Sequence, residues 1–167
     1  REAATDALTG VANRRHFLAQ ANDQMQHSSR SGRSLCVAVI DIDGFKQIND
    51  TCGHAAGDAA LEHFARVTER RVREVDLLGR LGGDEFGLLL PDTGIHEAYE
   101  VVDRIRRDLL AEPVPDLDLT EPLVITMSAG VAALRPSRGT LQEAIAEADS
   151  ALYKAKDQGR NRTIMVP

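Results

Sequence analysis

The sequence has few cysteines and no long hydrophobic run, and each shortage excludes a class of protein. Its 167 residues include two cysteines, Cys36 and Cys52, too few for a disulfide framework or a zinc site, so we expect a reducing compartment. No apolar run approaches the roughly 20 residues that a membrane-spanning helix needs. Internal repeats, low-complexity tracts and Pro/Gly/Ser-rich linkers are also missing, which favours a single domain over residues 1–167.

Positive charge is in short supply as well. The chain carries 20 basic and 26 acidic residues, a net charge of −6, whereas proteins that bind a nucleic acid polymer normally carry net positive charge. We therefore expect no nucleic acid partner. The chain begins at Arg1 without a signal-peptide pattern, and residues 1–5 are expected to be the end of an upstream linker helix in a longer protein. We expect a cytoplasmic domain, whether the parent protein is soluble or membrane-anchored.

Apolar spacing predicts alternating helices and strands. Helices are expected over four ranges, 17–25, 61–72, 98–109 and 141–155, and a shorter one begins near Lys46. The continuous apolar run at 35–40 predicts a buried central strand, and further strands are expected at 123–131 and 163–166. The apolar stretches 77–81 and 86–90 flank Gly82-Gly83, which indicates a hairpin. Strands that alternate with helices but include a hairpin predict an α/β fold with a mixed sheet.

Two acidic pairs stand where predicted strands end or turn. Asp41 and Asp43 follow the first strand, and Asp84 and Glu85 follow the glycine pair. If that strand lies beside the hairpin, all four carboxylates meet at one site, where they raise one another's pKa unless a cation neutralises them. Mg²⁺ binds a few carboxylates together with substrate phosphates, and two such ions support phosphoryl or nucleotidyl transfer. The alternative is that these residues are solvated turn formers.

Basic and amide side chains could complete a nucleotide site. Lys46 begins the short predicted helix, whose free N–H groups could face a phosphate. Lys156 and Arg160 lie at the end of the last helix, where they could equally be favourable C-terminal charges. Asn49 and Asp58 could be helix caps, or they could bind the hydrogen-bonding edge of guanine.

Four ordered segments resemble the GGDEF family of bacterial diguanylate cyclases over nearly the full chain. They are DALTGVANRR (6–15), DIDGFKQIND with GHAAGD (41–58), GGDEF (82–86) and ALYKAKDQGRNR (151–162). The resemblance implies a mixed, mainly antiparallel central sheet surrounded by helices, similar to nucleotide cyclase and polymerase palm domains. It also implies that two GTP molecules are joined into cyclic di-GMP with loss of two pyrophosphates.

The resemblance assigns the metal site and the reacting groups. Asp41, the backbone carbonyl of Ile42 and Asp84 correspond to ligands of Mg²⁺, with two ions, or Mn²⁺ in their place, for each GTP. Lys46 corresponds to a residue that stabilises the transferring phosphate. Either Asp84 or Glu85 would help to remove the proton from the attacking 3′-hydroxyl.

The resemblance also assigns the contacts to GTP. Asn49 and Asp58 match the positions that bind guanine, and His54 lies in the same substrate segment. Lys156 and Arg160 match the pair that contacts the terminal phosphates. Each domain would hold one GTP, so turnover needs a homodimer, controlled by an upstream sensory or regulatory domain.

An inhibitory site for the product is implied by Arg73-Glu-Val-Asp76. This segment resembles the RxxD motif of the family, at which bound cyclic di-GMP holds the domains apart, and Arg104 sits where a second arginine is expected. Without the motif, Arg73 would be interpreted as an exposed arginine at a helix end.

Two other functions stay open at this stage. A catalytically silent domain could act as a receptor for cyclic di-GMP or GTP. The carboxylates alone would also suit a general palm-type nucleotidyl transferase or an adenylyl cyclase.

Overall fold

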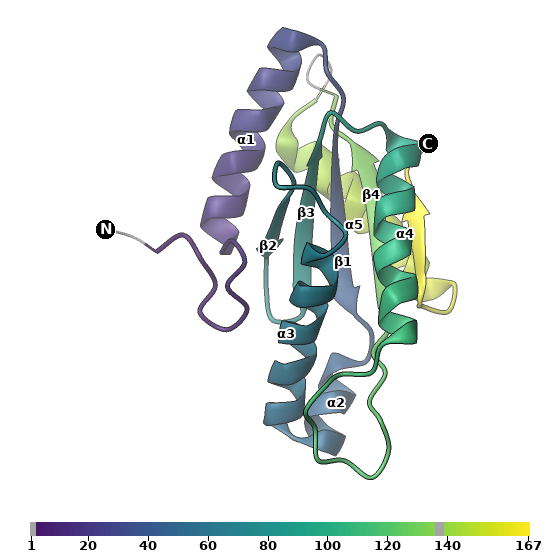
Figure 1. The fold of residues 1–167 in the computed structure, drawn as a ribbon. Helices are drawn as coiled ribbons and strands as arrows, with labels where there is room; N and C mark the ends of the chain where they lie inside the picture. Colours follow the sequence, from purple (N-terminus) through teal and green to yellow (C-terminus); the bar gives the residue numbers. More distant parts are fainter. Residues whose placement is uncertain (1–2, 136–138) are drawn as a thin grey trace.

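The computed structural model describes residues 3–135 and 139–167 (Figure 1). In chain order its elements are α1 (Arg14–Ser31), β1 (Leu35–Ile42), α2 (Phe45–Cys52), α3 (His54–Glu69), β2 (Leu77–Arg80), β3 (Glu85–Pro91), α4 (Ile95–Ala111), β4 (Met127–Ala133), α5 (Leu141–Asp157) and β5 (Arg162–Met165). In these described ranges, none of the helices is both long and apolar enough to cross a bilayer.

The strands form one mixed sheet in the order β2-β3-β1-β4-β5. β1 runs antiparallel to both of its neighbours, β3 and β4, and β2 pairs antiparallel with β3. Only the β4–β5 pair, among the described residues, is parallel. The expected mixed, mainly antiparallel sheet is confirmed, and so is the hairpin around Gly82-Gly83.

β1 is buried along its whole length because helices cover both faces of the sheet. Side chains alternate between the two faces of a strand. Cys36, Ala38 and Ile40 belong to the core formed with α3 and α4. Val37 and Val39 belong to a second core formed with α1 and α5. Figure 1 shows α3 and α4 in front of the sheet and α5 behind it, so the uninterrupted apolar run at 35–40 reflects burial on both faces.

Two predicted elements extend several residues beyond the observed ones. The strand expected at 123–131 begins only at Met127. The Thr126 carbonyl still accepts from the N–H of Asp43 at 2.9 Å, one step beyond the Ile42–Met127 pair, whereas the Leu123 carbonyl accepts from Val114 outside the sheet at 2.8 Å. The second predicted helix, α3, ends at Glu69, before Val72.

The start of the chain also differs. The helix end predicted for residues 1–5 is wrong for residues 3–5, and residues 1–2 lie outside the described residues. Thr5 forms an antiparallel bridge with Ala12, which itself bridges Gly79 on the edge of β2. These backbone bonds hold the segment extended beside the sheet, which excludes a helix there.

Candidate active site

The acidic residues converge at one end of the sheet, where β1 meets the β2–β3 turn. Asp41 on β1 lies directly opposite Glu85 on β3 in the antiparallel register. The N–H of Ile42 donates to the backbone oxygen of Asp84 at 3.3 Å. The hairpin between β2 and β3 therefore brings Asp84 and Glu85, more than 40 residues further along the sequence, next to the end of β1.

Asp41 is the most buried carboxylate at this end, with 8% of the residue exposed. One of its oxygens, Oδ2, pairs with the ammonium group of Lys156 on α5. The other, Oδ1, is buried without a hydrogen-bond partner among the described residues. Burial raises the pKa of Asp41, and the Lys156 charge opposes this rise. The pKa of Glu85 is also raised, first by burial and then by the negative charge of Asp41.

These oxygen atoms fit a small divalent cation. In the described parts of the chain, no three or more His, Cys, Asp or Glu side chains form a complete metal cage. Mg²⁺ does not need one, because it commonly binds one or two carboxylates and completes its shell with substrate phosphates and water. Asp41 Oδ1 is an unpartnered buried acceptor, and the nearby Asp84 charge contributes to the raised pKa of Asp41. Asp41, Asp84 and the carbonyl of Ile42 thus offer the hard oxygen atoms that Mg²⁺ or Mn²⁺ prefers.

Asp43 does not join this carboxylate group, contrary to the expectation that four acids meet at one site. The hydroxyls of Thr126 and Ser128 each donate to it at 2.7 Å, and the backbone N–H of Asn161 donates at 3.0 Å. Its oxygens are therefore occupied, and they tie the end of β1 to β4 and to the segment before β5. The alternation of the strand did not reveal this, because all three partners lie more than 80 residues away.

The predicted substrate-binding residues lie on α2, α3 and the end of α5. Asn49 on α2 lies against α3 because Gly57 has no side chain: a Cβ there would come 1.8 Å from Asn49 Oδ1. Lys46, His54 and Asp58 are exposed on these two helices.

Lys156 and Arg160 belong to the other side of the site. The ammonium group of Lys156 forms an ion pair with the Asp41 carboxylate, whereas Arg160 is exposed in the turn after α5. The structure thus brings Lys156 to the carboxylates.

Arg73 and Asp76 of the predicted inhibitory segment meet directly. The guanidinium of Arg73 donates to Asp76 at 2.7 and 3.2 Å, and further to the carbonyl of Pro91 at 2.6 Å and to the hydroxyl of Thr93 at 3.0 Å. The Asp76 side chain is 3% exposed, but that of Arg73 is 52% exposed and open to a ligand.

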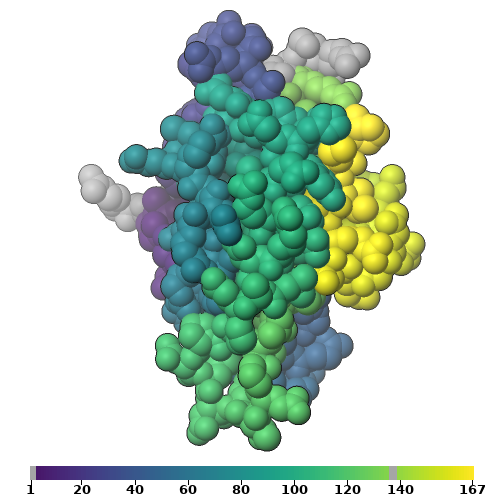
Figure 2. Space-filling model, turned by 45° about the vertical axis from the view of Figure 1, so that its right-hand side comes forward, coloured from purple at the N-terminus to yellow at the C-terminus, as the bar shows by residue number. Residues whose placement is uncertain are grey.

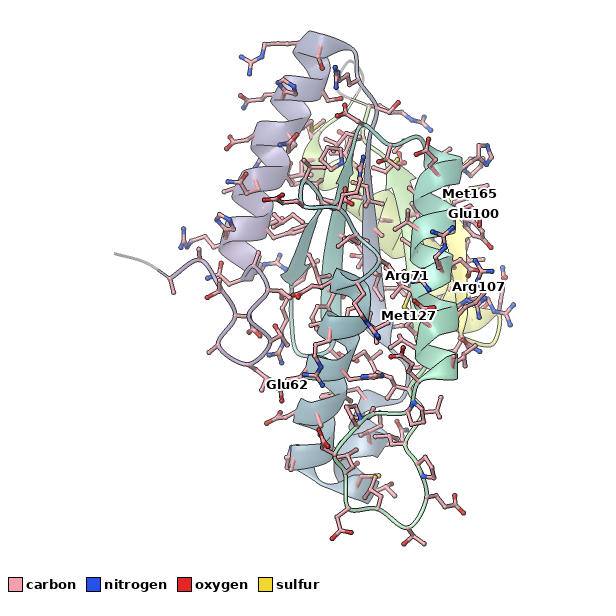
Figure 3. All side chains as sticks on the ribbon, viewed as in Figure 1. Glu62, Arg71, Glu100, Arg107, Met127 and Met165 are labelled. Atoms are coloured by element: carbon pink, nitrogen blue, oxygen red, sulfur yellow. The ribbon has the colours of Figure 1, made fainter. Side chains whose placement is uncertain are left out.

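Arg104 lies exposed on α4. One helical turn further on, Asp108 pairs with Arg71, which Figure 3 shows between α3 and α4. This ion pair connects α4 to the segment that leads to Arg73.

Sequence reasoning missed Arg80, which joins the start of the chain to the glycine turn. Its guanidinium donates to the carbonyls of Gly82 at 3.3 Å and Gly83 at 2.8 Å, and to both oxygens of Asp6 at 3.3 Å. Burial raises the pKa of Asp6, but hydrogen bonds from Thr9 and the Arg80 charge outweigh burial, so the net pKa is lowered. Both residues stand inside or beside recognisable motifs, yet their pairing spans 74 residues.

Asp149 was also missed. Its charge raises the pKa of both Asp41 and Glu85. It stands seven residues before Lys156 on α5, and that helical spacing, two turns on one face, was a signal that could have found it.

Comparison with known proteins gives consistent matches. The family model described as "Diguanylate cyclase, GGDEF domain" matches residues 3–162. The response regulator PleD of Caulobacter vibrioides is 38% identical over 162 residues, which cover 97% of this chain but 36% of PleD. The chain thus spans about a third of the length of that relative.

Solved structures are similarly close. The GGDEF domain of DgcB from Caulobacter crescentus, in complex with c-di-GMP, superposes with a TM-score of 0.93 at 32% identity, covering 99% of this chain and 94% of that one. The diguanylate cyclase SiaD, in complex with its activator SiaC from Pseudomonas aeruginosa, gives a TM-score of 0.91 at 40% identity, covering 98% of this chain and 62% of that one.

Proposed function

The chain belongs to the diguanylate cyclase GGDEF-domain family, and from this membership we propose that it condenses two GTP molecules into cyclic di-GMP with release of two pyrophosphates. One observation carries the proposal: the buried Asp41 carboxylate beside Glu85, with Oδ1 unpartnered and Oδ2 held by Lys156. Such a carboxylate is costly for a domain to keep unless it binds a cation. With GTP as substrate, we also propose a cytoplasmic location.

Two Mg²⁺ ions, or Mn²⁺ in their place, would be held by Asp41, the Ile42 carbonyl and Asp84. When bound there, the metal would neutralise the negative charge of the phosphates and make the reacting phosphorus more open to attack. Lys156 would then share its ammonium between Asp41 and the terminal phosphates, with Arg160 as its neighbour on those phosphates. Lys46, exposed at the start of α2, would approach the transferring phosphate.

The proton of the attacking 3′-hydroxyl would pass to Asp84 or Glu85. Glu85 is supported by its raised pKa, because a base works best with a pKa nearer the working pH. Asp84 is supported by its place in the exposed glycine turn, where a second substrate can approach.

Guanine would be bound between α2 and α3. The amide of Asn49 and the carboxylate of Asp58 together match the donors and acceptors on the guanine edge, with His54 at the start of the same helix. The close approach of Asn49 to Gly57 supports this, because it fixes one of the two side chains.

Two copies of the domain are needed in this proposal, since each holds one GTP and the reaction joins two. Catalysis then depends on holding the two nucleotides in the correct orientation. Product would bind at Arg73, Asp76 and Arg104 and separate the copies. An upstream sensory or regulatory domain in the parent chain would control the pairing.

A receptor function is the second candidate. The half-exposed Arg73, fixed by Asp76, Pro91 and Thr93, would serve a silent receptor for cyclic di-GMP equally well. The two functions differ in whether GTP is consumed.

The experiment is to incubate the domain with GTP and Mg²⁺, with ATP as the matched control, and to identify the product by mass. We expect cyclic di-GMP from GTP and no cyclic product from ATP. Asp84→Asn should abolish turnover but keep cyclic di-GMP binding, whereas Arg73→Ala should do the reverse. Product binding without GTP turnover in the unmodified chain would establish the receptor function instead.

A further inference from the structure

The turn between α5 and β5 has an unusual backbone. Gly159, Arg160 and Asn161 have φ values of 118, 64 and 47°, three consecutive residues in a region that side-chain-bearing residues seldom adopt. Such a conformation persists only where neighbouring groups hold it. Arg160 is the middle residue, so the direction of its side chain depends on this turn.

Asp43 makes the first contact that fixes the backbone of this turn. Its Oδ2 accepts the backbone N–H of Asn161 at 3.0 Å. Thr126 and Ser128 fix the same carboxylate from the strand side at 2.7 Å each. The backbone of Asn161 is thereby tied to the end of β1, two residues from Asp41.

Arg106 on α4 makes the second contact that fixes the turn, also at Asn161. Its Nη1 lies 3.3 Å from Asn161 Oδ1 and 3.5 Å from the Asn161 carbonyl oxygen. Asp103 orients the guanidinium through two bonds, at 2.6 and 3.1 Å, and itself accepts from Thr163 on β5 at 3.2 Å. The Arg106 and Asp103 side chains are only 18% and 15% exposed, and Figure 2 shows α4 and the C-terminal segment as one continuous surface.

We propose that Arg106 is a positioning residue for the phosphate end of the active site, acting through Asn161 on the turn that carries Arg160. Asp103 orients the Arg106 guanidinium, which contacts the side-chain and carbonyl oxygens of Asn161. Asp43 accepts the backbone N–H of Asn161. This inference rests on the proposed function, in which Arg160 contacts the terminal phosphates of GTP.

A merely structural role for Arg106 would alter stability and leave GTP affinity alone. The chain offers a matched control in Arg107, the next residue on α4 (labelled in Figure 3). Within the described residues, its guanidinium pairs with the same Asp103 at 3.7 Å and makes no hydrogen bond to Asn161. Asn161→Gly is a second test variant, because glycine keeps the left-handed backbone and removes the side chain whose Oδ1 contacts Arg106.

The experiment measures KM and kcat for GTP in the Mg²⁺ complex, GTP affinity, and amide hydrogen exchange of residues 159–162. Arg106→Ala should raise KM about tenfold, the scale expected when one positioning contact is lost, with a smaller change in kcat. Exchange in the turn should become faster. Arg106→Lys should recover part of the affinity, Asn161→Gly should resemble Arg106→Ala, and Arg107→Ala should match the unmodified chain.

A double-mutant cycle with Arg160→Ala then tests whether the effect of Arg106 on GTP binding passes through Arg160. If Arg106 acts through Arg160, its removal should raise KM by less than about twofold in the Arg160→Ala background. Full additivity, an unchanged KM, or unchanged exchange at 159–162 would overturn the inference. If the unmodified chain binds GTP without making cyclic di-GMP, only the proposed reaction fails, and GTP affinity replaces KM. If it binds no GTP, the proposed function fails and the exchange of the turn alone decides whether Arg106 holds it.

Discussion

Asp41 carries an energetic cost that its neighbours only partly relieve. Its carboxylate is buried, one oxygen has no partner among the described residues, and the negative charges of Asp84 and Asp149 oppose its ionisation. The pKa is therefore raised despite the pairing with Lys156. A folded-state pKa above the unfolded value means that the folded protein binds the proton more tightly, so stability falls as pH rises through the interval between the two values.

Asp41→Asn should therefore make the metal-free domain more stable at pH 7 while abolishing GTP turnover. We expect a gain of about 1 kcal/mol, or a Tm higher by roughly 2–4 °C, because the amide removes the buried charge. Thermal unfolding between pH 4 and 8 without Mg²⁺ checks this: the advantage of the variant should shrink toward the acid end. A variant less stable than the unmodified chain at pH 7 would show that the pair with Lys156 outweighs burial.

Gly57 is the second residue with a specific consequence. Gly57→Ala should raise KM for GTP about tenfold, because the added Cβ would overlap Asn49 Oδ1 and displace the side chain proposed to bind guanine. Stability should change little, since alanine favours the helix by up to about 1 kcal/mol and Asn49 can rotate away.

The matched control for this variant is Gly94→Ala, where an added Cβ meets nothing within 4 Å and φ is an ordinary −78°. Its KM should stay at the value of the unmodified chain. An unchanged KM for Gly57→Ala would remove Asn49 from the guanine site.

Among the elements, the contact between α5 and β4 sets where Lys156 lies. A Cβ at Gly130 on β4 would come 1.9 Å from the backbone oxygen of Ala148 and 2.5 Å from the nitrogen of Leu152. Backbone atoms of a helix cannot rotate aside as a side chain can. The missing side chain therefore lets α5 lie directly on the sheet, which carries Lys156 to Asp41.

Gly130→Ala should push α5 away from β4. We expect a loss of about 1–3 kcal/mol in the free energy of unfolding, the usual cost of overpacking, together with reduced turnover, because Lys156 leaves Asp41. Denaturant unfolding and GTP turnover measure the two effects. An unchanged midpoint would contradict the close packing of this helix on the strand.

The elements also show which features the sequence pattern could predict. The apolar run at 35–40 indicated β1, and Gly82-Gly83 indicated the hairpin, because burial and turn chemistry are local properties. The start of the 123–131 strand was wrong because the ladder with β1 ends at Thr126, and Leu123 bonds Val114 outside the sheet. Residues 3–5 were mispredicted since Thr5 pairs with Ala12, which is itself held by Gly79 on a distant strand edge.

In the site, too, local features were predictable from the sequence and contacts between distant residues were not. Asp41, Asp84 and Glu85 were predictable because each stands at a strand end or turn. Two long-range contacts were not predictable. Asp43 accepts the N–H of Asn161, 118 residues away, and Arg80 donates to Asp6, 74 residues away. Helical and strand periodicity describes neighbours along the chain and contains no information about partners across the fold.

In the whole molecule, the proposed active site and the proposed product site are separate but connected. Arg73 and Asp76 immediately precede β2, and β2 leads within a few residues to the glycine turn that carries Asp84. A ligand on Arg73 would therefore act on a surface distinct from the carboxylates, as allosteric inhibition requires. The net charge of −6 also suits this arrangement, since GTP would be held through cations and a few basic side chains.

The most direct test of the central claim is the rate of cyclic di-GMP formation per subunit, measured with GTP and Mg²⁺ across the concentrations at which light scattering shows monomers becoming dimers. We expect a product with the mass of cyclic di-GMP and a rate per subunit that rises with the dimer fraction and then levels off. A different product, or a rate per subunit that stays constant while the monomer converts to dimer, would contradict a diguanylate cyclase that works across two domains.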